Sequence, residues 1–328
     1  MTQTIGGWDV HTHIVPPAVV AAGGRGAFGM RASPDTLTIC AHGIPLHPLS
    51  DVNKLIDRVK SDQLDGAVVS VPPPLFRPDL SEADCRDYAK LVNEGIVEAC
   101  RDHDGVLRPL AYLPVEAPEV AASIAAGLDG RWAGVVMGTE ANDVSYASER
   151  LDPLWRVLSE RKLALFIHPG STPDKRLDPF YLTNLLGNPV ETTIAASNLV
   201  FAGVMQRHPG FNIILAHGGG CVAALCGRWQ RGAATKRPGI PDMSLKPLEA
   251  VRRFYVDSLV HSPMFLETII KTIGESRVLL GSDWPFPMGA PSAEHDLGHL
   301  DEKTRLRIRK LNAEEAFGVR LKKRQGVS

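Results

Sequence analysis

Short apolar runs recur along the whole chain, separated by longer stretches in which apolar residues have a helical spacing. Several of the runs are dense in Val, Ile and Leu and do not alternate with polar residues. Strands that are buried on both faces have this composition, because neither face meets water. We therefore predict eight strands, at residues 8–11, 66–71, 106–113, 133–137, 163–168, 211–217, 254–257 and 278–283.

Helical patterns occupy the segments between these runs. Ser81 begins the motif SEAD, which is typical of a helix N-terminus, and apolar residues from Tyr88 to Ala99 then share one helical face. Further helices are predicted between strands at residues 116–129, 151–161, 189–207 and 262–273. Alternating strands and helices imply parallel pairing through right-handed crossovers. Eight such strands favour a closed (β/α)₈ barrel of the TIM type, formed by a single domain over residues 1–328.

Two segments interrupt the alternation. Residues 14–50 are rich in Gly and Pro and are too long for an ordinary loop between a strand and a helix. We predict that they form a small flap or mini-sheet, inserted after the first strand, over the mouth of the barrel. Residues 232–249 contain prolines and several charges, and they predict a surface loop.

Composition and charge exclude several classes of protein. The chain has 36 Lys and Arg against 37 Asp and Glu, so its net charge of −1 gives no reason to expect nucleic acid or an anionic membrane as a partner. No apolar run approaches the roughly 18 residues that span a bilayer, and the first residues lack the pattern of a signal peptide. The five cysteines form no CxxC pair, which is typical of reduced thiols. We therefore expect a cytoplasmic protein.

The sharpest local feature is the motif DVHTH at the end of the first predicted strand. Side chains two residues apart in a strand point to the same face, so His11 and His13 can reach one point. Imidazole nitrogens suit Zn²⁺ and similar ions, and two convergent ones make half of a metal site. Taken alone, however, such a pair is more often two polar residues at a strand end.

Three further side chains extend this pair into a larger group. His168, His217 and Asp283 each stand where an apolar strand ends and a turn begins. In a parallel barrel these positions share one rim, which is the face that carries active sites. Metal-capable residues at the ends of four strands are difficult to explain by packing, so they predict a site for one divalent metal ion. His261 follows another strand toward the same rim, and we expect it to line the pocket.

Two other motifs carry less weight. A GxGxxG pattern occupies residues 24–29, but no strand precedes it, and dinucleotide binding requires strand, turn and helix in that order. The HGGG at residues 217–220 is similar to an esterase oxyanion loop, but the chain has no GxSxG motif to accompany it. Neither motif therefore supports a nucleotide-binding protein or a serine esterase.

Together these features resemble the amidohydrolase superfamily, and within it the branch of aminocarboxymuconate semialdehyde decarboxylase and the resorcylate-type decarboxylases. The similarity extends over nearly the whole chain, through DVHTHIVPP, FIHPG, PVETTIAAS, ILAHGGG followed by Arg228, YVDSLVHSP and VLLGSDWPFPMG. It implies one divalent metal ion, usually Zn²⁺ with Mn²⁺ as an alternative, and water in the open position. It also implies that His217 acts as acid and base, and that the metal ligands are His11, His13, His168 and Asp283.

The resemblance further implies a homodimer, in which Arg228 reaches the substrate carboxylate of the neighbouring subunit, a task that suits a guanidinium. The chain departs from the decarboxylase pattern at two substrate contacts. The flap arginine of the branch has no clear counterpart in GIPLHPLSD, and Gly170 stands where a tryptophan is expected. Both departures bear on the substrate and leave the metal ligands intact. We hypothesise that Arg77 supplies the missing positive charge.

Three functions remain open on these grounds. The first is that of a carboxy-lyase, which decarboxylates a small unsaturated or aromatic carboxylic acid without oxidation, with His217 and Asp283 managing the proton that replaces CO₂. The second is metal-dependent hydrolysis of an amide, a lactone or a C–C bond by the same site. The third is metal binding without catalysis, which is disfavoured because binding alone needs no acid–base histidine.

Overall fold

Eight parallel strands form one sheet, and each strand pairs with the next one along the chain. The computed structural model describes residues 6–40, 42–139, 144–170 and 172–321. Each strand overlaps one of the runs that the apolar pattern predicts, which confirms the (β/α)₈ barrel. The strands are β1 (Trp8–His13), β5 (Gly66–Ser70), β6 (Leu107–Tyr112), β7 (Gly134–Met137), β8 (Ala164–Ile167), β9 (Ile213–Leu215), β10 (Tyr255–Asp257) and β11 (Val278–Leu279).

The first and last strands close the barrel. The backbone N–H of Val10 donates to the carbonyl of Leu280 at 2.9 Å, and that of Asp283 donates to the carbonyl of His11 at 2.8 Å. Thr12 then forms a parallel bridge with Trp284. Closure therefore brings the two ends of the sequence together on one rim.

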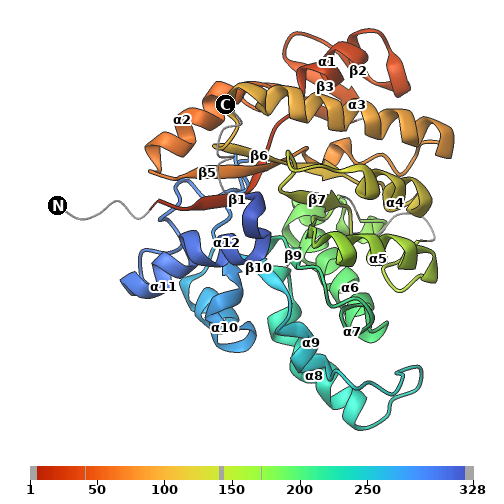
Figure 1. Ribbon diagram of the computed structural model, residues 1–328, viewed down its shortest axis with the longest axis vertical. Helices are drawn as coiled ribbons and strands as arrows, with labels where there is room; N and C mark the ends of the chain where they lie inside the picture. Colours follow the sequence, from red (N-terminus) through yellow and green to blue (C-terminus); the bar gives the residue numbers. More distant parts are fainter. Residues whose placement is uncertain (1–5, 41, 140–143, 171, 322–328) are drawn as a thin grey trace.

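Helices surround the barrel, as Figure 1 shows. In α3, the Asp84 N–H donates to Ser81 Oγ at 3.2 Å, which caps the helix, and the predicted apolar face buries Tyr88 and Val92. The helices of the barrel and its C-terminal part are α2 (Val52–Ser61), α3 (Glu82–Cys100), α4 (Pro118–Gly127), α5 (Asp152–Arg161), α6 (Asn188–Phe201), α7 (Val204–Arg207), α8 (Val222–Ala234), α9 (Pro247–Val251), α10 (Pro263–Ile273), α11 (Glu302–Leu306) and α12 (Asn312–Phe317).

The helices differ from the prediction at two places. The single helix expected over residues 189–207 is divided into α6 and α7, because Gly203 between them has a left-handed φ of 67°. The surface loop was expected over residues 232–249, but the first of these residues belong to α8 and the last to the short helix α9. Apolar spacing alone did not predict α8, which contains two glycines.

Residues 14–50 contain a small sheet. The segment forms α1 (Pro17–Gly24) and an antiparallel sheet of β2 (Arg31–Ala32), β3 (Thr36–Ile39) and β4 (His42–Pro45). The sheet packs on α1, and α1 packs on α3 at the outer side of the barrel (Figure 1). The position of this insertion over the barrel mouth stays a prediction.

Two observations bear on the expected surroundings of the protein. Within the described residues, every helix is too short or too polar to cross a membrane. The five cysteines form no disulfide with one another. The cytoplasmic location stays a prediction.

Candidate metal centre

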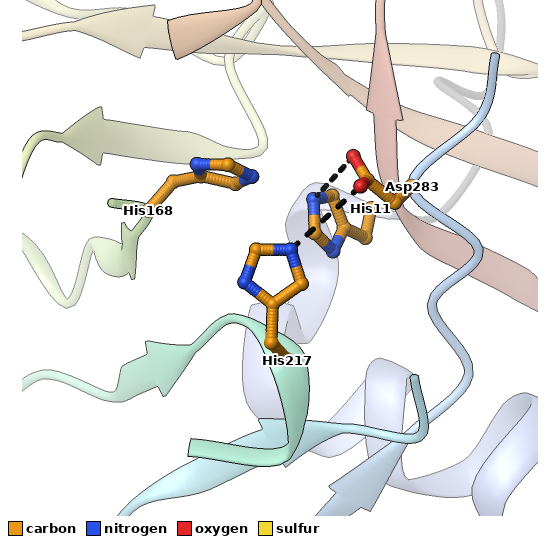
Figure 2. A group of neighbouring side chains, drawn as sticks. All are labelled: His11, His168, His217 and Asp283. Atoms are coloured by element: carbon orange, nitrogen blue, oxygen red, sulfur yellow. Dashed lines mark ion pairs between the residues drawn. The ribbon is translucent and has the colours of Figure 1, made fainter. Parts of the chain in front are cut away.

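Five polar side chains converge at the carboxyl ends of four barrel strands. β1 supplies His11 and His13, and the turns after β8, β9 and β11 supply His168, His217 and Asp283. Figure 2 shows His11, His168, His217 and Asp283 pointing from separate elements toward a common space. The structure therefore brings together every residue that the sequence assigned to the metal and to acid–base chemistry.

Three donor atoms of this group form a nearly equilateral triangle. Nε2 of His11 lies 3.1 Å from Nε2 of His13 and 3.2 Å from Oδ1 of Asp283, and Nε2 of His13 lies 3.0 Å from the same oxygen. Ligands at roughly 2.0–2.2 Å from a metal ion lie about 3.0–3.5 Å apart, so the triangle has the dimensions of a ligand set. The donor atoms of His11, His168, His217 and Asp283 all lie within 4.8 Å of one another.

The second ring nitrogens show how three of the imidazoles are held. Nδ1 of His11 lies 2.7 Å from Asp257 Oδ2, and Nδ1 of His13 lies 3.0 Å from Ser70 Oγ. Nδ1 of His168 lies 2.8 Å from the carbonyl oxygen of Pro169. Each contact leaves Nε2 free to face the centre, as metal-binding histidines require. Nε2 of His168 is buried and has no hydrogen-bond partner. Because an unpaired buried polar atom costs about 1–3 kcal/mol, this nitrogen fits a metal ligand better than a packing residue.

The electrostatics of the centre favour a cation. Burial lowers the pKa of His168 well below its usual value, and the neighbouring His11 and His217 lower it further, so His168 is neutral and keeps its lone pair. Burial would raise the pKa of Asp283, but His11 and its other imidazole neighbours hold that pKa well below the usual range. Burial likewise lowers the pKa of His11, but Asp283 and then Asp257 outweigh burial and raise it to about 10. The potential that favours a protonated imidazole also favours a divalent ion.

Sequence reasoning missed two buried carboxylates beneath the centre. Asp257 is fully buried and accepts hydrogen bonds from the His11 ring and from the backbone N–H groups of His217 and Gly218. Asp9 accepts from the backbone N–H and the hydroxyl of Ser282, at 3.0 and 2.5 Å. A signal for Asp257 was available, because it ends a predicted strand in the same way as Asp283 does.

A cavity of about 380 Å³ opens beside His217 and Asp283. Its walls are mainly apolar, and no Lys or Arg is among the described residues that line it; the apolar part includes Leu185, Ala224, Leu259, Val260, Phe265 and Met288. A larger cavity of about 660 Å³ lies on the outside of the barrel between α3 and α4, away from all five rim side chains. The smaller cavity is therefore the one suited to a substrate.

The structure places the three predicted substrate-binding residues differently. His261 is exposed and lines the cavity beside His217. Arg228 is exposed on α8 and lies outside the cavity lining. The guanidinium of Arg77 donates to both oxygens of Asp79, at 2.7 and 2.6 Å, and to the carbonyl of Phe28 at 3.0 Å. These contacts tie the segment after β5 to the insertion, and a contact of Arg77 with substrate stays a prediction.

The variant Arg77→Ala distinguishes a structural role of Arg77, through its bonds to Asp79 and Phe28, from a role in substrate binding. The Arg77 side chain is 5% exposed, but that of Asp79 is 44% exposed and regains water, so we expect unfolding in urea to become easier by about 1–2 kcal/mol. The KM for substrate should stay near the wild-type value. The matched variant Arg150→Ala, which breaks only an exposed 3.7 Å contact with Glu119, should change neither quantity. A tenfold rise in KM for Arg77→Ala would support the substrate contact instead.

Comparison with known proteins places these features in a family context. A family model described as amidohydrolase matches residues 8–319. A 2-amino-3-carboxymuconate-6-semialdehyde decarboxylase of Dictyostelium discoideum is 28% identical over 302 residues, which are 86% of this chain and 82% of that protein. A 6-methylsalicylic acid decarboxylase of Penicillium expansum is 29% identical over 311 residues, 88% of this chain and 86% of that protein.

Solved structures share the fold. A 5-carboxyvanillate decarboxylase of Novosphingobium aromaticivorans, complexed with manganese and 4-hydroxy-3-methoxy-5-nitrobenzoic acid, superimposes with a TM-score of 0.80 at 20% identity. The match covers 95% of this chain and 96% of that one. At this identity the likeness supports the architecture alone.

Proposed function

Because the chain belongs to the amidohydrolase family, we propose that it is a metal-dependent decarboxylase, a carboxy-lyase that releases CO₂ without oxidation from a small aromatic or unsaturated carboxylic acid. The observation that carries this proposal is that a cluster of histidines with one aspartate borders an apolar cavity. The names of the two decarboxylase relatives support the same reaction. A flat, largely apolar acid suits the cavity, because its walls offer aromatic and aliphatic contacts, with no Lys or Arg among the described residues that line it.

The proposed ligands of the ion are His11, His13, His168 and Asp283. Three imidazoles and one carboxylate suit Zn²⁺, and we propose Zn²⁺ with Mn²⁺ as the alternative. Bound there, the ion supplies a Lewis acid that anchors the substrate and stabilises negative charge as it develops. His217 differs from the four ligands, because its Nε2 faces the other carboxylate oxygen of Asp283, Oδ2, at 3.7 Å.

His217 and Asp283 are the proposed proton carriers. When the bond to the carboxylate breaks, its electron pair stays on the substrate carbon, and a proton must replace CO₂ there. His217 borders the cavity with its side chain 17% exposed, so its imidazole can deliver that proton. Asp283 holds the ring of His217 in position and stabilises the imidazolium. The apolar walls orient the ring of the substrate and limit the access of water.

A paired assay tests this function. The metal-loaded protein is incubated with hydroxybenzoic acids that carry methyl or methoxy groups and with unsaturated carboxylic acids, and CO₂ release is measured. Esters, lactones and amides of similar size are tested in parallel for hydrolysis. We expect CO₂ release from at least one aromatic acid. Hydrolysis without CO₂ release would favour the hydrolase and contradict the proposal.

We further propose that the protein is a homodimer in which Arg228 contacts the substrate in the neighbouring subunit. Cys221 and Ala224 line the cavity, and Arg228 follows them on the same face of α8, four residues beyond Ala224. Leu185, which lines the cavity, is 52% exposed, and the same segment of the chain exposes further apolar side chains that a second copy would cover: Phe180 is 85% exposed, Tyr181 63% and Leu186 45%.

The variant Arg228→Ala tests the shared site. Loss of a charge-assisted hydrogen bond worth about 1.5–3 kcal/mol should raise KM roughly 10- to 100-fold and leave the metal content unchanged. Steady-state kinetics measure the role of Arg228 in substrate binding, and sedimentation measures the oligomeric state. The control is Arg86→Ala, which removes an exposed arginine on α3. An unchanged KM would refute the role of Arg228, and a monomer at assay concentrations would refute the dimer.

A further inference from the structure

One buried carboxylate contacts both the proposed metal ligand His11 and the segment that carries His217. Oδ2 of Asp257 lies 2.7 Å from Nδ1 of His11 and accepts the backbone N–H of His217 at 2.9 Å. Oδ1 accepts the backbone N–H of Gly218 at 2.8 Å and that of Leu259 at 3.2 Å. Asp257 is 0% exposed, so water does not compete for these four donors.

We propose that Asp257 is a positioning residue, which sets the ring tautomer of His11 and holds the backbone that presents His217, and so couples metal binding to proton delivery. This inference rests on the proposed function for the roles of His11 and His217. Its part concerning the metal depends only on the cluster itself and can be measured without a substrate.

The tautomer of His11 follows from the chemistry of its partner. The carboxylate of Asp257 accepts three backbone N–H groups, so it is an acceptor for His11 as well, and Nδ1 of His11 carries the proton and donates it. In the neutral ring that binds a metal ion, Nε2 is then left with a lone pair, and it faces His13 and Asp283 at 3.1 and 3.2 Å. A carboxylate behind a metal-binding histidine also raises the basicity of the ring.

The turn after β9 depends on the same carboxylate. His217 and Gly218 both have a left-handed backbone, with φ of 55° and 64°, which is unfavourable for a residue with a side chain such as His217. The two N–H groups of this turn point at Asp257, which accepts both of them. A methyl group at Gly218 would lie 2.2 Å from Val260 Cγ1, so the turn has no room to shift on that side. The direction of the His217 ring therefore depends on Asp257.

The segment that follows the last strand leaves space for this arrangement. A Cβ atom on Gly281, two residues after β11, would lie 2.7 Å from Cβ of Asp257 and 2.9 Å from Cβ of His11. Only a residue without a side chain lets the two groups meet across this segment. Asp9, the other buried carboxylate beneath the rim, bonds the backbone N–H of His11 at 3.1 Å and does not contact its ring. Asp283 also faces both rings, but only through their Nε2 atoms, at 3.2 Å in His11 and 3.7 Å in His217. Among the acidic residues that the structure describes, Asp257 is the one that contacts Nδ1 of His11 and the backbone of His217.

The variant Asp257→Asn tests the inference with little change in shape. Its amide has one acceptor oxygen for four donors, so whichever way it turns, the donors on one side face an NH₂ group. We expect metal affinity to fall about 10- to 100-fold, which is typical when a group behind a metal ligand is removed. At saturating metal, kcat should also fall at least about tenfold, with KM within about threefold of wild type, because substrate contacts remain.

Metal affinity is measured by competition with a chelator and by the visible spectrum of the Co²⁺-loaded protein, both without substrate. Kinetics are measured separately on whichever reaction the wild type catalyses, so a failure of the decarboxylase proposal does not affect the metal result. Circular dichroism and the Tm of the metal-free protein check the fold. The control is Asn312→Ala, which removes bonds to the carbonyls of Glu275 and Val278, at 2.8 and 2.7 Å, near the opposite end of β11. It should lower Tm and keep metal affinity.

A second variant covers the case in which Asp257→Asn does not fold. Gly281→Ala keeps every polar group but forces Asp257 and His11 apart, so it should reproduce the loss of metal affinity and of kcat. Wild-type metal affinity together with wild-type kcat in either folded variant would overturn the inference. A loss of Tm alone, as in Asn312→Ala, would likewise assign Asp257 a purely structural role and overturn it.

Discussion

Replacing His168 by asparagine should almost abolish metal binding and activity while leaving the metal-free protein as stable as before. The amide nitrogen of asparagine can take the place of Nδ1 and keep the bond to the Pro169 carbonyl, which measures 2.8 Å. The substitution therefore removes Nε2, the buried nitrogen that has no hydrogen-bond partner, together with the adjoining ring carbon Cε1. Because Nε2 makes no hydrogen bond, its loss removes no stabilising polar contact, and the metal-free Tm should stay close to that of the wild type.

The size of the effect follows from the energetics of metal sites. Structural zinc sites contribute roughly 10–16 kcal/mol, so one ligand of four represents roughly 2.5–4 kcal/mol and a loss of affinity of about 10²- to 10³-fold. Metal content after dialysis, chelator competition and kcat/KM measure the change. The matched control is His103→Asn, on a half-buried histidine in the short helix that follows α3. Full metal content in His168→Asn would remove His168 from the ligand set.

The second large effect is expected for His217→Asn. If His217 delivers the proton and does not bind the ion, kcat should fall about 10²- to 10⁴-fold, the usual contribution of a general acid or base. Metal affinity should stay within a few-fold of wild type, because His217 is not one of the four proposed ligands, His11, His13, His168 and Asp283. KM should change little.

Product analysis in D₂O makes this test specific. The wild type should place one deuterium on the carbon that lost CO₂, and mass spectrometry measures its rate of incorporation in the variant. Since the donor atoms of His217 also lie within 4.8 Å of those of His11, His168 and Asp283, the variant decides between two roles for this residue. Loss of the metal ion in His217→Asn would make it a ligand, and a kcat within tenfold of wild type would exclude it as the proton donor.

The fold was predictable from local patterns because the strands of a parallel barrel are buried on both faces and therefore appear in the sequence as continuous apolar runs. Residues 211–217 and 278–283 illustrate this, since they contain β9 and β11 and their Ile, Val and Leu side chains are all buried. The ends of the individual strands and helices were predicted less accurately than their presence. β9 comprises only Ile213–Leu215, and Gly203 ends α6 early through a backbone angle that apolar spacing does not encode.

The rim was predictable for a related reason. Each of His168, His217 and Asp283 follows its own apolar run, and parallel strands place all such positions on one face. The sequence did not reveal what else each polar residue contacts. Arg77 was a candidate for binding the substrate carboxylate, and the sequence did not show that it bonds Asp79 and the carbonyl of Phe28, which lies 49 residues earlier in the chain.

The sequence by itself determined the class of fold, the rim and the set of metal-capable residues, because these depend on the periodicity of side chains and on where each strand stops. Only the tertiary structure decided which nitrogen of each imidazole faces the centre, that Nε2 of His168 has no partner, and that Asp257 contacts both His11 and the turn of His217. These properties depend on distances and burial between residues that are far apart in the chain, such as the 246 positions that separate His11 from Asp257. Closure of β11 onto β1 and the packing of β10 beside them create those distances, and no local pattern of residues contains them.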